Sequence, residues 1–144
     1  MRAVVTRVKS ASVTIDGHIN GEIGQGFLVL LGVGPDDTEA VCDKLAEKIC
    51  NLRVFEDENG KMNRSLDQVG GSLLVVSQFT LYADTSSRRP GFSGAAKPDL
   101  AVPLYERFMD QCRARGFRVE HGQFGADMKV ASVNDGPVTI LYDL

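Results

Sequence analysis

A Gly-Pro step near the C-terminus separates two segments of strand-like composition, residues 127–133 and 138–144. Proline cannot donate to a β-ladder and is confined to strand edges, strand starts and bulges. The residues before it, Asn134-Asp135-Gly136, have the composition of a turn. Taken alone, this pattern predicts a hairpin corner between two strands, because Gly/Pro punctuation usually marks turns.

A second unusual segment lies mid-chain. Ser77-Gln78-Phe79-Thr80-Leu81 continues directly from the apolar run 73–76, which is typical of a strand buried on both faces. We therefore predict a strand over 72–82 that ends in polar groups. The strand period of two places Gln78 and Thr80 on one face and Ser77 and Phe79 on the other.

Length and charge limit the possible classes of protein. A chain of 144 residues fits a single domain, 1–144. The net charge of −3 gives no overall basic footprint, so any RNA contact is expected to be local and no DNA partner is expected. Three cysteines without a Cys-x-x-Cys pair indicate buried thiols in a reducing compartment. No apolar leader or eighteen-residue apolar run is present, so we expect a cytoplasmic protein without a membrane partner.

Periodicity predicts a mixed, β-rich α+β fold, because strands outnumber helices and do not alternate regularly with them. We expect strands over 2–8 and 12–16, paired around a short turn, and over 26–33, 53–55, 72–82, 117–121, 127–133 and 138–144. A long loop is expected over 84–98.

Two helices are predicted. The first is capped by Asp36 with Glu39, ends near Asn51 and buries a face of Val41, Leu45 and Ile49. The second is capped by Asp99, carries Pro103 in its first turn and has Gly116 as its C-terminal cap. Its buried face consists of Leu104, Phe108 and Cys112.

The residues offer little conventional catalytic chemistry. The two histidines, His18 and His121, have no metal-ligand spacing, so neither a metal nor another cofactor is expected. Thr80 has no base near it in the sequence. An ordinary strand threonine therefore remains an open interpretation of Thr80, since β-branched residues are enriched in strands.

The two segments together resemble the signatures of the D-aminoacyl-tRNA deacylases, Ser-Gln-x-Thr-Leu and Asn-x-Gly-Pro-Val-Thr, the second formed here by Asn134, Gly136, Pro137, Val138 and Thr139. The resemblance extends over the whole chain. Further matching segments are Arg7-Val8-Lys9-Ser10-Ala11-Ser12-Val13, Gly60-Lys61-Met62-Asn63 and Arg89-Pro90-Gly91-Phe92. It implies a barrel-like core of mixed and antiparallel sheets with two main helices.

The resemblance also implies hydrolysis of the ester of D-aminoacyl-tRNA, at the 3′ end of the tRNA. This ester is already activated and lies next to a ribose hydroxyl, so positioning by Ser77, Gln78, Phe79 and Thr80 can suffice. Backbone N–H groups of Phe79 and Thr80 are then the expected oxyanion hole. Thr80 is interpreted as a positioning or water-orienting residue, with direct nucleophilic attack as the weaker option.

Selection of D-residues requires a reading of the chiral centre that ignores the side chain. In the family, a cis Gly-Pro bond of each subunit enters the partner's site, so Gly136 and Pro137 are the expected filter across a homodimer. Arg7 is expected to anchor this turn through its carbonyls; otherwise it is a surface arginine on an edge strand. Because a smaller acyl group is hard to exclude, the resemblance also implies removal of glycine mischarged on tRNA(Ala).

Contacts with the RNA are a weaker expectation. Arg88, Arg89, Lys61 and Arg64 are candidates for phosphate contacts, although solvated surface charges are equally common. Phe79 or Phe92 is a candidate for stacking on the terminal adenine, against the alternative of a core phenylalanine. Two other functions stay open: a non-catalytic dimeric module that binds RNA ends or small ligands, and a general esterase with Thr80 as nucleophile.

Overall fold

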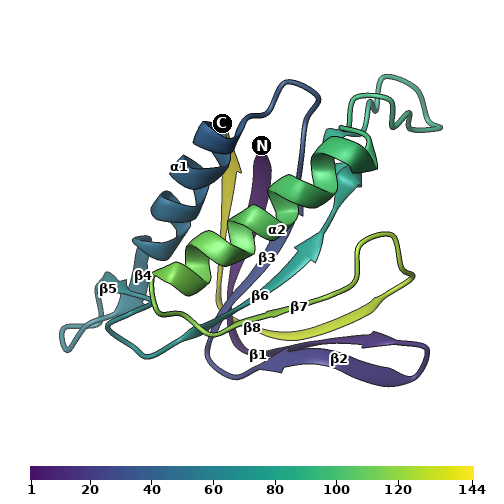
Figure 1. The fold of residues 1–144 in the computed structure, drawn as a ribbon. Helices are drawn as coiled ribbons and strands as arrows, with labels where there is room; N and C mark the ends of the chain where they lie inside the picture. The colour runs from purple at the N-terminus through teal and green to yellow at the C-terminus, as the bar shows by residue number, and fades with distance from the viewer.

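The structure is a computed structural model that describes residues 1–144 (Figure 1). In chain order its elements are β1 (Arg2–Ile15), β2 (His18–Ile23), β3 (Gly26–Gly32), α1 (Glu39–Cys50), β4 (Arg53–Glu56), β5 (Met62–Ser65), β6 (Ser72–Ser77), the 3-10 helix η1 (Phe79–Tyr82), α2 (Pro98–Ala114), β7 (Val119–His121) and β8 (Lys129–Asp143). The predicted β-rich α+β class with two main helices is confirmed. No helix is long and apolar enough to cross a membrane.

Six strands form one mixed sheet in the order β2-β1-β3-β6-β7, with β8 paired to β1. β1 runs antiparallel to β2, β3 and β8, whereas β3, β6 and β7 are parallel to one another. β4 and β5 form a separate antiparallel pair.

The large sheet curls until its two end strands meet. The side-chain amide of Asn20 in β2 donates to the carbonyl of His121 in β7 at 2.7 Å. Gly21 permits this approach, because a Cβ there would lie 2.9 Å from the same carbonyl oxygen. The predicted barrel-like core is therefore confirmed as a nearly closed sheet.

Each face of the sheet carries its own apolar cluster. Alternate residues of β3 and β6 point to opposite faces, as the strand period requires. The larger cluster joins the sheet to the two helices and includes Phe27, Val29, Leu31, Leu73 and Val75. The smaller lies inside the curl and consists of Val8, Ala11, Val13, Ile23, Leu28, Leu74 and Val76. Burial on both faces explains why the 73–76 run is continuously apolar.

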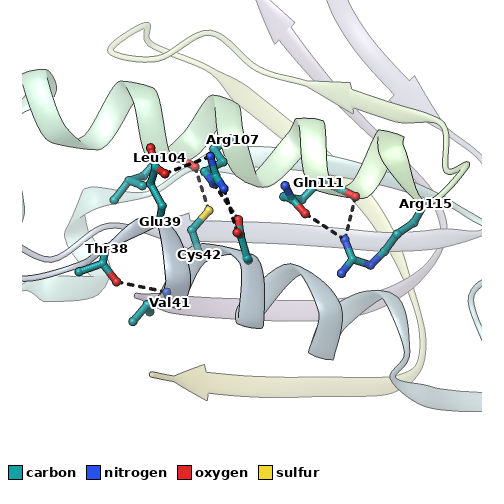
Figure 2. Close-up of polar contacts among 9 residues, drawn as sticks. Thr38, Glu39, Val41, Cys42, Leu104, Arg107, Gln111 and Arg115 are labelled. Atoms are coloured by element: carbon teal, nitrogen blue, oxygen red, sulfur yellow. Dashed lines mark hydrogen bonds and ion pairs between the residues drawn. The ribbon is translucent and has the colours of Figure 1, made fainter.

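The two helices pack together through polar as well as apolar contacts (Figure 2). Arg107 of α2 forms a two-pronged contact with the carboxylate of Asp43 in α1, at 2.7 and 2.9 Å, and lies 3.2 Å from Glu39. Its guanidinium holds the pKa of Asp43 below the usual range. The thiol of Cys42 donates to the carbonyl of Leu104 at 3.3 Å. All three cysteines are buried, as predicted.

Three predictions about strands are wrong. Residues 2–8 and 12–15 belong to the single strand β1, and the hairpin instead joins β1 to β2 through Asp16 and Gly17, whose φ angles are +50° and +79°. The strand predicted over 72–82 ends at Ser77, where the chain enters η1. The two segments predicted over 127–133 and 138–144 fall in the single strand β8, apart from residues 127, 128 and 144, so the Gly-Pro step is an interruption within one strand and no hairpin corner.

Both predicted helix starts also need correction. Thr38, rather than Asp36, caps α1 and accepts a hydrogen bond from the N–H of Val41 at 3.3 Å (Figure 2). At α2 the cap position is Lys97 without a side-chain bond, and Pro103 lies inside the helix because Pro98 already begins it. The predicted buried faces are confirmed, with Val41 only partly covered. α2 ends at Ala114, and Gly116, with φ +90°, follows the cap residue Arg115.

Candidate active site

The Ser77–Leu81 segment changes from strand to a single 3-10 turn. The N–H of Gln78 still bonds to the carbonyl of Leu31 in β3 at 2.8 Å, and Phe79 then begins η1. Gln78 and Thr80 therefore do not share a strand face. They nevertheless meet, because the side-chain amide of Gln78 donates to the hydroxyl oxygen of Thr80.

In the folded chain no carboxylate or imidazole forms a hydrogen bond with the Thr80 hydroxyl. The amide of Gln78 is its side-chain partner within the chain. His18 opens β2, and His121 in β7 places its Nδ1 2.5 Å from the carbonyl of Gly122. No three His, Cys, Asp or Glu side chains gather where a metal ion would need them. The geometry fits a hydroxyl that is oriented and half-buried, without an adjacent proton acceptor.

Aromatic and apolar side chains surround this turn. Phe79 is 54% exposed and Phe92 41% exposed, and their rings meet edge to face with centroids 5.3 Å apart. The hydroxyl of Tyr105 in α2 donates to the carbonyl of Val75 at 2.9 Å. A small, mostly apolar pocket lies beneath the turn and is lined by Leu31, Val33, Ser77, Gln78, Phe79, Ala96, Ala101, Tyr105 and Phe124.

The Gly136–Pro137 bond is cis and lies in a bulge of β8. Thr6 pairs with Thr139 and Val8 with Asn134, so Arg7 alone faces the four residues 135–138. Gly136 has φ +119°, and a Cβ there would lie 2.9 Å both from Nη2 of Arg7 and from Cγ2 of Val138. Only glycine fits this position without displacing its neighbours.

Arg7 occupies the gap behind the bulge. Its side chain is 7% exposed, so the alternative of a surface arginine on an edge strand is wrong. Nε donates to the carbonyl of Asp135 at 3.1 Å, and Nη1 donates to the carbonyl of Val54 at 2.5 Å. The carboxylate of Asp135 lies 3.6 Å from Nε. The predicted bond from Arg7 to a carbonyl of the turn is present.

Within one chain, the Gly-Pro bulge lies far from Thr80. Arg7 pairs with Phe27, which pairs with Leu73, whereas Gln78 bonds to Leu31. From the bulge to Gln78, the path crosses from β8 over β1 and β3 to β6, which is three strand spacings, and runs from Phe27 to Leu31 along β3, which is four residues. The two components are perpendicular and together give a separation of roughly 20 Å. A chain therefore does not bring its own Pro137 to its own Thr80.

The candidate RNA-contacting residues fall into two groups. Arg88, Arg89 and Phe92 are exposed in the loop after η1, where Asp84 and Gly91 form an isolated bridge. Lys61 lies on the β4–β5 turn at the opposite end of the molecule (Figure 1). Arg64 is paired with Glu58 at 3.0 Å. The structure does not bring these two groups together.

Two residues near η1 escaped the sequence analysis. Nη1 of Arg2 donates to the carbonyl of Leu81 at 2.9 Å, and its guanidinium carbon lies 4.5 Å from the ring centroid of Tyr82. The one sequence feature that pointed to this region was Gly32-Val33-Gly34, because glycines at the end of a strand often mark a place where another segment packs closely.

Comparison with known proteins decides the family. The family described as D-Tyr-tRNA(Tyr) deacylase matches residues 4–143. A D-aminoacyl-tRNA deacylase of Symbiobacterium thermophilum is 58% identical over 144 residues, covering 99% of this chain and 95% of that protein. A D-aminoacyl-tRNA deacylase of Roseiflexus castenholzii is 60% identical over 144 residues, covering 99% of this chain and 92% of that protein. This chain belongs to the D-Tyr-tRNA(Tyr) deacylase family.

Two solved structures share this fold. A protein named c-Myc DNA Unwinding Element Binding Protein superposes with a TM-score of 0.93 at 42% identity, covering 100% of this chain and 99% of that one. A probable eukaryotic D-amino acid tRNA deacylase gives a TM-score of 0.86 at 18% identity, covering 99% and 98%, which supports the fold alone. Both signature segments, Ser77–Leu81 and Asn134–Thr139, lie within the residues that the family matches.

Proposed function

We propose that this chain hydrolyses the ester of D-aminoacyl-tRNA by positioning the substrate, with the stereochemical filter supplied by a second copy of the chain. The observation that carries this proposal is the arrangement around Thr80. Its hydroxyl is held by Gln78 and has no adjacent base, so a covalent route through Thr80 lacks the group that would activate it.

The substrate supplies part of the chemistry. An aminoacyl ester is a good acyl donor, and the vicinal ribose hydroxyl can take part in proton transfer. Water then attacks the ester carbonyl, the carbon–oxygen bond to the ribose breaks, and the ribose oxygen takes up a proton. Ser77, Gln78 and Thr80 orient the ester and the water. The products are a free D-amino acid and tRNA.

Backbone N–H groups are our candidates for stabilising the developing oxyanion. The first bond within η1 is from Leu81 N–H to the carbonyl of Gln78, so the N–H groups of Phe79 and Thr80 have no partner within the turn. A preorganised donor of this kind contributes about 10²–10³ in rate.

Stereochemical selection is assigned to Gly136 and Pro137 of the partner subunit. Backbone atoms in a fixed conformation present the same surface to every acyl group, so they read the chiral centre and ignore the side chain. Val138, Thr139, Asn134 and Arg7 hold this surface in shape. Such a filter leaves achiral glycine poorly excluded, so we include glycine mischarged on tRNA(Ala) among the substrates.

The homodimer is supported by the exposed face of β8. This strand has 15 residues and a free edge, and long unprotected edges are templates for association. Val133 is 56% and Leu141 75% exposed within the single chain. A two-fold interface over this strand would cover them and carry both Gly-Pro bulges to the partners' sites.

Two lesser contacts belong to the same proposal. Phe92, which contacts Phe79 of η1, and Arg88 and Arg89 of the same loop are assigned to the 3′ end of the tRNA. A contact of Lys61 with the tRNA would involve a different part of the tRNA. Cytoplasmic location follows from the tRNA substrate. The non-catalytic binding module and the general esterase are the competing functions.

One assay separates these functions. Purified protein is incubated with D-tyrosyl-tRNA, L-tyrosyl-tRNA and a simple ester such as D-tyrosine methyl ester, and released amino acid is measured. We expect turnover of the D-aminoacyl-tRNA only. Binding without release would favour the binding module, and rapid turnover of the methyl ester would favour the esterase.

A further inference from the structure

The η1 turn that carries Phe79 and Thr80 cannot hold its own shape. It comprises four residues, none of them fully buried. A single 3-10 turn has few internal bonds of poor geometry, so its conformation depends on outside contacts. At its start, the N–H of Gln78 is fixed to the carbonyl of Leu31 at 2.8 Å. Whatever fixes its end also fixes Thr80.

Arg2 contacts the end of η1 in two ways. Its Nη1 donates to the carbonyl of Leu81 at 2.9 Å, and its guanidinium carbon lies 4.5 Å from the centroid of the Tyr82 ring. The first contact is charge-assisted and the second is a cation–π contact. Arg2 Nε also lies 3.4 Å from the carboxylate of Asp143, but both side chains are exposed, so this ion pair contributes little beside the contacts with Leu81 and Tyr82.

The end of β3 is shaped to receive the same turn. A Cβ at Gly34 would lie 3.0 Å from the Tyr82 ring, and a Cβ at Gly32 would lie 3.2 Å from Cβ of Leu81. Arg2 pairs with Gly32 across the β1–β3 ladder, so its strand neighbour has no side chain to compete for the space. Burial raises the pKa of Tyr82 to about 12, with Asp37 as a second contributor and Arg2 acting in the opposite direction.

We propose that Arg2 is a positioning residue of the deacylase site: together with Tyr82 it clamps the end of η1 onto β3 and thereby sets the position of Thr80. Arg2 does not touch the reacting atoms. The expected effect of Arg2 on kcat rests on the proposed function. The contacts of Arg2 with Leu81 and Tyr82 exist in the free protein and do not depend on it.

The test compares Arg2→Met and Arg2→Lys with the matched control Asp143→Asn. The control removes the ion pair of Arg2 but leaves its contacts with Leu81 and Tyr82. The amides of Leu81 and Ala83 report on η1, since they donate to the carbonyls of Gln78 and Thr80 at 3.2 and 3.1 Å. Hydrogen exchange at these amides and at those of the β1–β3 ladder is measured together with kcat and KM for D-tyrosyl-tRNA.

In Arg2→Met we expect exchange at Leu81 and Ala83 to rise about tenfold or more, while the β1–β3 ladder stays protected. We expect kcat to fall about tenfold or more, because small displacements of positioning groups have effects of this size, while KM changes less than twofold. Arg2→Lys keeps the charge but not the planar contact, so it should lie between Arg2→Met and wild type. Asp143→Asn should resemble wild type.

Two results would overturn the inference: unchanged exchange at Leu81 and Ala83 in Arg2→Met, or a kcat within twofold of that of Asp143→Asn. If Arg2→Met does not fold, the same two criteria apply to Arg2→Lys. Failure of wild-type protein to turn over D-tyrosyl-tRNA would contradict the proposed function, but the exchange experiment would still decide whether the clamp exists.

Discussion

Arg7 faces the bulge that contains Gly136 from the neighbouring strand, with its Nε 3.1 Å from the carbonyl of Asp135 and its Nη2 2.9 Å from where a Cβ of Gly136 would lie. One residue of β1 thus fills the space opposite four residues of β8. The guanidinium also reaches Val54, so it links the bulge to the β4–β5 pair. The conformation of the Gly-Pro step is therefore fixed by a side chain of the same chain, before any partner binds.

Removing this side chain should harm both stability and activity. Arg7→Met leaves the buried carbonyl of Val54 and the partly buried carbonyl of Asp135 without these donors, so we expect a loss of about 2–4 kcal/mol in the free energy of unfolding. Urea unfolding measures this loss. Arg118→Met is the control, because Arg118 is an exposed arginine that also bonds to a carbonyl, that of Glu22. Equal losses in the two variants would contradict the role given to Arg7.

Chelation should leave activity intact. No group of metal-binding side chains surrounds Thr80 or the bulge, so the reaction is assigned to positioned hydrogen-bond donors. We expect deacylation of D-tyrosyl-tRNA to continue at its initial rate after prolonged dialysis against EDTA. Complete loss of activity, restored by one added metal, would sink this part of the account.

Thr80 should be helpful but dispensable. Thr80→Ala removes the hydroxyl that Gln78 orients, and we expect a fall in kcat of about 10-fold to 100-fold with measurable turnover remaining. An obligate nucleophile would leave almost none. Mass spectrometry of wild-type protein quenched during turnover provides the complementary check, and an acyl group on Thr80 would overturn our interpretation.

Alkaline pH should destabilise the fold through Tyr105. Burial raises the pKa of this hydroxyl to about 12 from an unfolded value of about 10. Its contribution is therefore complete below about pH 10 and is lost as the pH rises toward 12, because only the unfolded state ionises readily. Tyr105→Phe lacks the hydrogen bond to Val75, so it is about 1 kcal/mol less stable than wild type below pH 10. It has no hydroxyl to ionise, so its stability does not fall further at alkaline pH for this reason. The stability gap between the two proteins should narrow above pH 10, and parallel curves would refute the assignment.

Substitution of Gly136 should abolish activity, both by steric clash with neighbouring side chains and by straining the backbone. Gly136→Val collides with Arg7 and Val138, and its φ of +119° is unfavourable for any side chain. We expect loss of D-tyrosyl-tRNA turnover. Gly60→Ala is the control, since its φ is +75° but no atom lies within 4 Å of the added Cβ. The control should lose stability by about 1 kcal/mol and keep its activity.

The sequence predicted the fold wherever local pattern decides structure. Leu45 and Ile49 in α1 and Phe108 in α2 follow helical periodicity, and all are buried. The errors arose where tertiary contacts override local signals. Asn134–Pro137 has turn chemistry, but ladder bonds to β1 on both sides keep it within one strand. The sequence predicted that the strand continues through the polar Ser77 and Gln78 to residue 82, and it contains no local signal for the 3-10 turn that follows Gln78.

The candidate site was reached through its motifs, and its supports were only partly foreseen. Arg7 was expected to bond to the turn, but its burial depends on a bulge that the sequence does not reveal. Arg2 lies 79 positions from Leu81, so only the folded sheet brings them together. A contact between residues so far apart in the chain leaves no repeating pattern in the sequence from which it could be predicted.

The cross-subunit filter is the central claim, and mixed dimers test it most directly. Gly136→Val subunits are co-assembled with subunits that carry Thr80→Ala and Gln78→Ala, and the tagged heterodimers are isolated. If each site takes its filter from the partner, both defects fall in one site and the other site is intact. We predict about half of wild-type turnover of D-tyrosyl-tRNA, with L-tyrosyl-tRNA still spared. Turnover no higher than that of the two mutant homodimers would mean that each chain filters its own site, which contradicts the account.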